Sequence, residues 1–135
     1  NQQGIGKGFM TPADLDAVHA KLYAALDAID ARIDAVRVCP HLAVAACSCR
    51  KPKPGMILDI AAELGADVRN AVFFGDTDSD AAAARAAGVA AFHLILGGKR
   101  TAEDALQTKY FPTPPDGVFP DLLSAVTSLL QASTT

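Results

Sequence analysis

The sequence lacks the features that mark several specialised classes of protein. Its 135 residues include no apolar run of the roughly 18 residues that a membrane-spanning helix needs, and its polar N-terminus shows no secretory signal. Basic residues are not in excess, because 12 Lys and Arg against 15 Asp and Glu give a net charge of −3. This balance argues against a nucleic-acid-binding protein. We therefore expect one soluble, cytoplasmic domain that contacts neither membranes nor nucleic acids.

Cysteine is also scarce, and all three cysteines fall within residues 39–49. A disulfide framework joins distant segments, so this cluster does not indicate one. The pattern Cys39-x-His41-x5-Cys47-x-Cys49 brings together three thiols and one imidazole, the ligand set of a tetrahedral zinc site. Four protein ligands leave no open position, so the predicted zinc is structural. The alternative is three buried cysteines beside a packed histidine.

The apolar pattern predicts an α/β fold. Thr11 as N-cap and Pro12 as first residue begin a helix, and further helices are expected after Pro54, over residues 79–87 and over residues 120–131. Strands that alternate with helices pair in parallel, so we expect a parallel sheet flanked by helices. The expected strands are residues 34–39, 71–74 and 89–96, and residues 97–118 are expected to be irregular. The apolar stripe of the first helix comprises Leu15, Val18, Leu22, Leu26, Ile29 and Ile33.

Two short motifs could bind a phosphate and a metal ion. Arg50 and Lys51 stand on a proline-bounded loop before a helix, where Lys is a point charge and Arg can bind two oxygens, although such pairs are often only solvated surface charges. Asp76 follows an apolar strand, and ligands of open α/β sheets bind at the carboxyl ends of strands. A carboxylate there suits Mg²⁺. Alternatively, the acidic run caps the next helix through Asp78, Ser79 or Asp80.

In order along the chain, these motifs resemble one family. The motifs are Asn1-Gln2-Gln3-Gly4-Ile5-Gly6, the Cys-x-His…Cys-x-Cys loop, Arg50-Lys51-Pro52-Lys53-Pro54-Gly55 and Gly75-Asp76…Asp80. Together they resemble the haloacid-dehalogenase (HAD) superfamily of phosphatases, over about residues 1–96. Within it, the resemblance is to the D-glycero-D-manno-heptose 1,7-bisphosphate 7-phosphatases. Histidinol-phosphate phosphatases share the zinc loop and are the nearest competing subfamily.

The resemblance implies a Mg²⁺-dependent phosphatase that acts on a small phosphorylated sugar. The phosphoryl group passes to an Asp nucleophile, and the aspartyl-phosphate is then hydrolysed. In this scheme Lys51 neutralises the phosphoryl group, Asp80 orients the site and Asp76 binds Mg²⁺. The implied substrate contacts are Asn1, Gln2, Gln3, Arg50, Lys51 and Thr77, and the implied zinc ligands are Cys39, His41, Cys47 and Cys49. The heptose enzymes usually carry Lys at the position of Thr77.

The family's first motif, Asp-x-Asp-Gly-Thr, supplies the nucleophile and does not occur in residues 1–135. We therefore expect residues 1–135 to be the C-terminal part of a single HAD-like domain, a Rossmann-like parallel sheet without its first strands. The absent strand is central in the family's strand order, so we expect unpaired sheet edges. Either this segment does not fold stably alone, or further residues precede it, and we expect no activity from the segment alone. The alternatives are another small sugar-phosphate phosphatase or a non-catalytic zinc-stabilised module. We expect a monomer.

Overall fold

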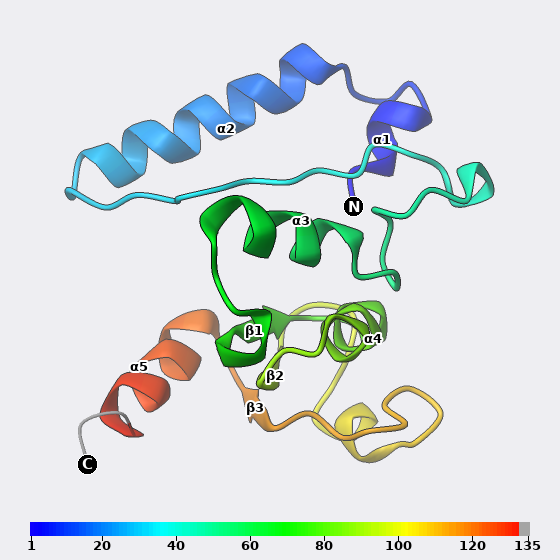
Figure 1. Cartoon of the computed structure of the whole chain (residues 1–135), viewed down its shortest axis with the longest axis vertical. Coiled ribbons are helices and arrows are strands. Elements are labelled where there is room, and N and C mark those ends of the chain that lie inside the picture. Colours follow the sequence, from blue (N-terminus) through cyan, green and yellow to red (C-terminus); the bar gives the residue numbers. More distant parts are fainter. Residues whose placement is uncertain (133–135) are drawn as a thin grey trace.

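The fold is built around a small parallel sheet. The computed structural model describes residues 1–132, and its three strands lie in the order β1-β2-β3. The strands are β1 (Val72–Gly75), β2 (Ala91–Ile95) and β3 (Gly117–Phe119), and both pairings are parallel. Helix α4 (Asp78–Ala87) packs on β1 and β2, α5 (Leu122–Ala132) packs on β3 and β2, and α3 (Gly55–Leu64) packs on α4 (Figure 1). The predicted α/β fold with a parallel sheet and flanking helices is confirmed.

The core lies between α4 and the sheet. Apart from Asp80, the buried residues of α4 are alanines, among them Ala84, which is fully buried. Phe92 and Leu94 of β2 are also fully buried and belong to the same cluster. Small side chains on the helix leave room for large ones on the strand, which is how interiors reach their high packing density. This packing holds the start of α4 at the carboxyl end of β1.

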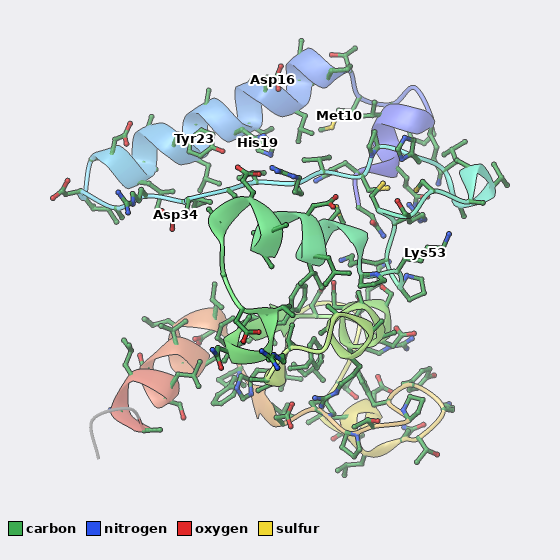
Figure 2. The ribbon with its side chains drawn as sticks, viewed as in Figure 1. Met10, Asp16, His19, Tyr23, Asp34 and Lys53 are labelled. Atoms are coloured by element: carbon green, nitrogen blue, oxygen red, sulfur yellow. The ribbon has the colours of Figure 1, made fainter. Side chains whose placement is uncertain are left out.

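A second layer lies above α3 (Figure 1). It contains α1 (Gln3–Gly6), α2 (Pro12–Asp27) and an extended segment over residues 31–40. The predicted start of α2 is confirmed, because Thr11 forms a capping box with Asp14. His19 and Tyr23 project from α2 toward the extended segment (Figure 2). No helix within residues 1–132 is long and apolar enough to cross a membrane.

The predicted strand over residues 34–39 is wrong. The segment is extended but pairs with no strand within residues 1–132, because it runs between α2 and α3, away from the sheet (Figure 1). It is held to α3 by an ion pair between Arg37 and Glu63. Extended backbone alone therefore does not make a strand where no neighbouring strand is in reach.

The predicted apolar stripe of the first helix is only partly correct. Helix α2 ends at Asp27, and Asp30 then turns the chain with a left-handed φ of 54°, so Ile29 and Ile33 lie beyond the helix. Of the six stripe residues only Leu15 is buried, whereas Ile29 is 73% exposed. The rest of this face is only partly covered, because Leu26 is half-buried whereas Val18 is 56% exposed.

Two predicted loops contain regular structure. Residues 1–10 include the short helix α1, and residues 97–118 include a 3-10 turn (Asp104–Leu106) and the start of β3. Strand β3 is only three residues long, and its sequence carries no alternating pattern. Asp116 fixes its start, because the Asp116 carboxylate accepts a hydrogen bond from the backbone of Phe92 at 2.7 Å while its own N–H donates to Phe92 O at 2.8 Å. The other helices begin and end within two residues of their predicted bounds.

Candidate functional site

The turn after β1 carries acidic side chains directly into α4. Thr77 is the N-cap of α4, so none of Asp78, Ser79 and Asp80 is the N-cap itself, but Asp80 completes a capping box by accepting the Thr77 N–H at 3.1 Å. The Thr77 hydroxyl accepts from the Asp80 N–H at 3.3 Å and donates to Asp80 Oδ2 at 2.6 Å. Gly75 permits this tight turn, because a Cβ there would lie 2.4 Å from the Asp80 Cβ. The result is a carboxylate folded back under the end of the strand.

Asp80 receives Lys51 from the loop before α3. Asp80 is 3% exposed, and the Lys51 ammonium donates a hydrogen bond to its Oδ1. Burial raises the pKa of Asp80, but hydrogen bonds from Lys51 and Thr77 outweigh it and hold the pKa below its usual value. Asp80 Oδ2 also accepts from the backbone N–H of Asp76 at 3.3 Å. The structure thus brings Lys51, Asp76 and Asp80 to one place at the carboxyl end of β1.

Asp76 has the properties of a cation ligand. It is exposed at the tip of β1, and its carboxylate accepts no hydrogen bond or ion pair from any residue in the range 1–132. The backbone of Gly98, in the turn after β2, lies against it: a Cβ on Gly98 would be 2.1 Å from Asp76 Oδ2. An available carboxylate at a strand end, with room for water and phosphate oxygens, fits the way proteins bind Mg²⁺.

The first residues of the chain lie beside the Arg50-Lys51 pair. The Lys51 N–H donates to Asn1 Oδ1 and the Arg50 guanidinium donates to Gln3 Oε1, each at 3.3 Å. Gln2 donates its N–H to the carbonyl of Cys39 at 2.8 Å. The structure therefore brings the first three residues of the chain, which are predicted substrate contacts, close to the Arg50-Lys51 pair. Thr77 differs from them, because its hydroxyl is directed to Asp80.

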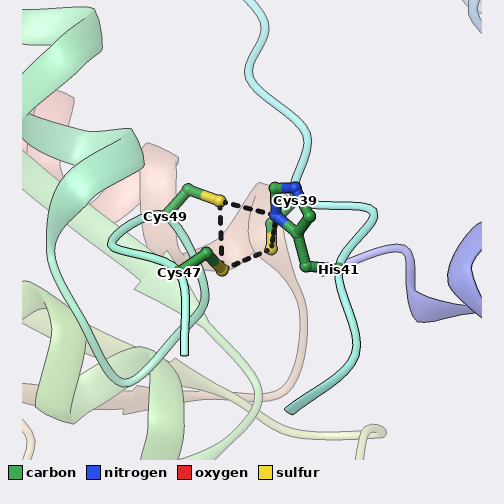
Figure 3. Close-up of side chains that lie close together, drawn as sticks. All are labelled: Cys39, His41, Cys47 and Cys49. Carbon is green, nitrogen blue, oxygen red and sulfur yellow. Dashed lines mark hydrogen bonds between the residues drawn. The ribbon is translucent and has the colours of Figure 1, made fainter. Parts of the chain in front are cut away.

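Cys39, His41, Cys47 and Cys49 form a compact cluster, in which each offers one ligand atom and all four atoms lie within 4.8 Å of one another (Figure 3). The shortest separations are 3.3 Å from His41 Nδ1 to Cys49 Sγ and 3.4 Å between the Cys47 and Cys49 sulfurs. With Zn–S bonds of about 2.3 Å, the edges between sulfur ligands of a tetrahedral site are about 3.8 Å, so the donor set and its spacing fit zinc. Arg50 ties this cluster to the site through a hydrogen bond to His41 O at 3.1 Å.

Cys47 and Cys49 of this cluster differ in their pKa values. Burial raises the pKa of Cys47, but hydrogen bonds from Cys49 and Cys39 bring it down to about 6. The hydrogen bond with Cys39, followed by burial, raises the pKa of Cys49 to about 12. Negative charge on one sulfur therefore opposes ionisation of the next, and a bound cation relieves that repulsion.

Comparison with known proteins identifies the family. A family model described as HAD-hydrolase-like matches residues 48–125, more than half of the chain. The chain belongs to the HAD-like hydrolases. The D-glycero-beta-D-manno-heptose-1,7-bisphosphate 7-phosphatase of Bordetella bronchiseptica is 38% identical over 100 residues, which are 74% of this chain and 56% of the relative. The enzyme of the same name from Pseudomonas aeruginosa is 35% identical over 97% of this chain and 71% of its own length.

A solved structure agrees with these matches. The crystal structure of D,D-heptose 1,7-bisphosphate phosphatase from B. bronchiseptica, complexed with magnesium and phosphate, superimposes with a TM-score of 0.84 at 34% identity. The match covers 98% of this chain and 72% of that one, so it extends beyond residue 96. The predicted membership in the HAD superfamily, close to the heptose bisphosphate phosphatases, is confirmed. This HAD-like chain spans little more than half the length of the first relative.

The sequence alone did not identify every residue around the HAD site. Gly98 is one of two adjacent glycines after a strand, which indicates a turn but not a partner. Its contact with Asp76 depends on how close the turn after β2 lies to the turn after β1. Arg100 gave no signal in the sequence. It donates two hydrogen bonds to Asp78 Oδ1, from Nε at 3.1 Å and Nη2 at 2.9 Å, and lies over the ring of Tyr110 at 3.8 Å.

Proposed function

We propose that residues 1–135 are the C-terminal part of a single HAD-like phosphatase domain, with its zinc loop at residues 39–49. The whole protein then removes the 7-phosphate of D-glycero-D-manno-heptose 1,7-bisphosphate. Relatives with this name, together with the magnesium and phosphate of the B. bronchiseptica structure, support the proposal. Because Asp-x-Asp-Gly-Thr does not occur in residues 1–135, the nucleophile is assigned to residues outside this range.

One observation carries the assignment: the Lys51 ammonium and the Asp76 backbone N–H both donate to the Asp80 carboxylate, which brings Lys51 to the turn that carries the Asp76 side chain. In the proposed reaction Lys51 offsets negative charge on the transferring phosphoryl group, and the ionised Asp80 holds Lys51 in place. Arg50, Asn1, Gln2 and Gln3 contact the substrate, with Thr77 at the base of the site. A guanidinium binds two phosphate oxygens at once, and side-chain amides suit sugar hydroxyls.

Two metal ions complete the proposal. Asp76 would hold Mg²⁺, which when bound neutralises phosphoryl oxygens. Cys39, His41, Cys47 and Cys49 would hold a structural zinc, which fixes the loop that leads into Arg50 and Lys51. Clustered thiols keep their metal-binding form in a reducing compartment, so we place the protein in the cytoplasm.

The test is phosphate release by the full-length protein. With Mg²⁺ present, we expect release from heptose 1,7-bisphosphate and much less from histidinol phosphate. Lys51→Met should lower kcat by about 10²-fold or more, because one preorganised cation at the reacting group is lost. Lys21→Met removes the same charge from the exposed face of α2 and should leave kcat unchanged. Zinc uptake without turnover of either substrate would instead indicate a non-catalytic module.

A further inference from the structure

The turn after β2 is pressed against the turn after β1. Gly98 lies so close to Asp76 that a Cβ would be 2.1 Å from Oδ2 and 2.5 Å from the Asp76 Cβ. The backbone of Gly98 therefore forms one wall of the space in which the Asp76 side chain can rotate. The Asp76 carboxylate has no hydrogen-bond partner among residues 1–132 to restrict its rotamer, so this wall is its main restraint.

Arg100 holds that turn in position. Its guanidinium makes two hydrogen bonds to Asp78 Oδ1, on the first turn of α4, and covers the ring of Tyr110. The side chain is only 22% exposed, so this pair is shielded from water more than an ordinary surface ion pair. Asp78 lies two residues after Asp76, and Gly98 lies two residues before Arg100. The ion pair consequently joins the two turns directly beside the Gly98–Asp76 contact.

We propose that Arg100 is a positioning residue for the divalent cation: by pairing with Asp78 and stacking on Tyr110, it keeps Gly98 against Asp76 and fixes that carboxylate in its ligating rotamer. The inference rests on the proposed function, in which Asp76 holds Mg²⁺. Groups behind a metal ligand that fix its orientation commonly change metal affinity 10- to 100-fold when removed. Arg100 acts through backbone and a neighbouring turn, so we expect an effect near the lower end of this range.

Direct metal binding is the measurement that tests the proposal. Mn²⁺ binding to the full-length protein, followed by electron paramagnetic resonance without substrate, should show a Kd raised about tenfold in Arg100→Gln. A purely electrostatic role predicts the opposite sign, because removal of a cation near the site lowers its repulsion of Mn²⁺. Asp78→Asn should weaken binding similarly, and the double variant should be no weaker than either single variant, since both remove the same contact.

Lys99→Gln is the matched control. Lys99 is the exposed neighbour of Arg100 in the same turn, and its loss should leave the Kd within about twofold of wild type. Unchanged Mn²⁺ affinity in Arg100→Gln, or an equal loss in Lys99→Gln, would overturn the proposal. If Arg100→Gln does not fold, as judged by zinc content and thermal melting, Arg100→Lys takes its place, because it keeps the positive charge, loses the two hydrogen bonds to Asp78 Oδ1 and should also raise the Kd. A wild-type protein that binds no Mn²⁺ would overturn the proposed function as well. Normal binding in the wild type with unchanged binding in Arg100→Gln would overturn only the role of Arg100.

Discussion

At the scale of single residues, Thr77 links a helix to the site. Its hydroxyl oxygen accepts the N–H of Asp80 and so begins α4, while its hydroxyl proton is donated to the Asp80 carboxylate that receives Lys51. One side chain thereby satisfies a free helix N–H and helps to keep Asp80 ionised. A lysine, which the resemblance to the heptose phosphatases implies at this position, could not make the same cap.

Thr77→Val tests how much the hydrogen bonds of the Thr77 hydroxyl contribute to stability, apart from the packing of the side chain. Valine has the same branched shape without the hydroxyl, so we expect a loss of about 1–2 kcal/mol in the free energy of unfolding. The measurement is urea denaturation of the full-length protein. Thr77→Ser keeps the hydroxyl and should lose less than about 0.5 kcal/mol. Equal stability of the two variants would show that the cap contributes little.

The proximity of three proposed site residues could be predicted from the sequence, but the residues that support them could not. Lys51, Asp76 and Asp80 stand in short motifs whose chemistry is local, and the structure brings them together as the motifs indicated. Asp78, Ser79 and Asp80 are all good cap formers, so composition could not single out Thr77. The role of Gly98 depends on the separation of two turns, a tertiary property that no local pattern encodes.

At the scale of elements, α4 shows why some segments were predictable. Its buried and exposed positions follow the helical period, and the capping residues and Gly88 mark its two ends. The 34–39 segment and β3 have no such internal signal, because pairing with a neighbour is what makes an extended segment a strand. Helices close their hydrogen bonds within themselves, so the bounds of α3, α4 and α5 were predicted within two residues, whereas α2 ends earlier than its apolar pattern indicated.

Ala84→Leu tests the close packing of α4 on the sheet. Ala84 is fully buried against the Phe92 and Leu94 cluster, so the added carbons should cost about 2 kcal/mol in the free energy of unfolding. Ala86→Leu, on the exposed side of the same helix, should change stability by less than about 0.5 kcal/mol. Thermal and urea unfolding measure both. A stable Ala84→Leu protein would mean that the core has more free space than the structure indicates.

At the scale of the whole molecule, the cysteine–histidine loop connects the two layers. Cys39 ends the extended segment of the upper layer, and Cys49 precedes Arg50, Lys51 and the helix α3 that packs on α4 (Figures 1 and 3). The positions of Arg50 and Lys51 thus depend on a loop with little apolar packing of its own. Val44, at its tip, is 89% exposed.

Zinc removal should therefore impair the proposed active site, although the zinc itself does not contact the substrate. We expect about one zinc per chain in the purified full-length protein. Chelation followed by excess Mg²⁺ should leave phosphatase activity low, and added zinc should restore it, because Arg50 and Lys51 regain their places. Cys47→Ser should lose zinc, whereas Ser48→Ala, in the same loop, should retain it. Full activity in a zinc-free protein would contradict a structural role for the metal.

The alternation of side chains in β1 also restricts the length of this strand. Phe73 packs in the α4 cluster and stacks on Phe92, while Phe74, on the opposite face, lies 5.7 Å from the ring of His93. Inserting one residue before Phe73 without compensation would exchange the faces of both phenylalanines. Inserting two would restore the faces but carry Asp76 about 7 Å along the strand, away from Lys51 and Gly98. An insertion or deletion in β1 is consequently expected to disrupt either the core or the site.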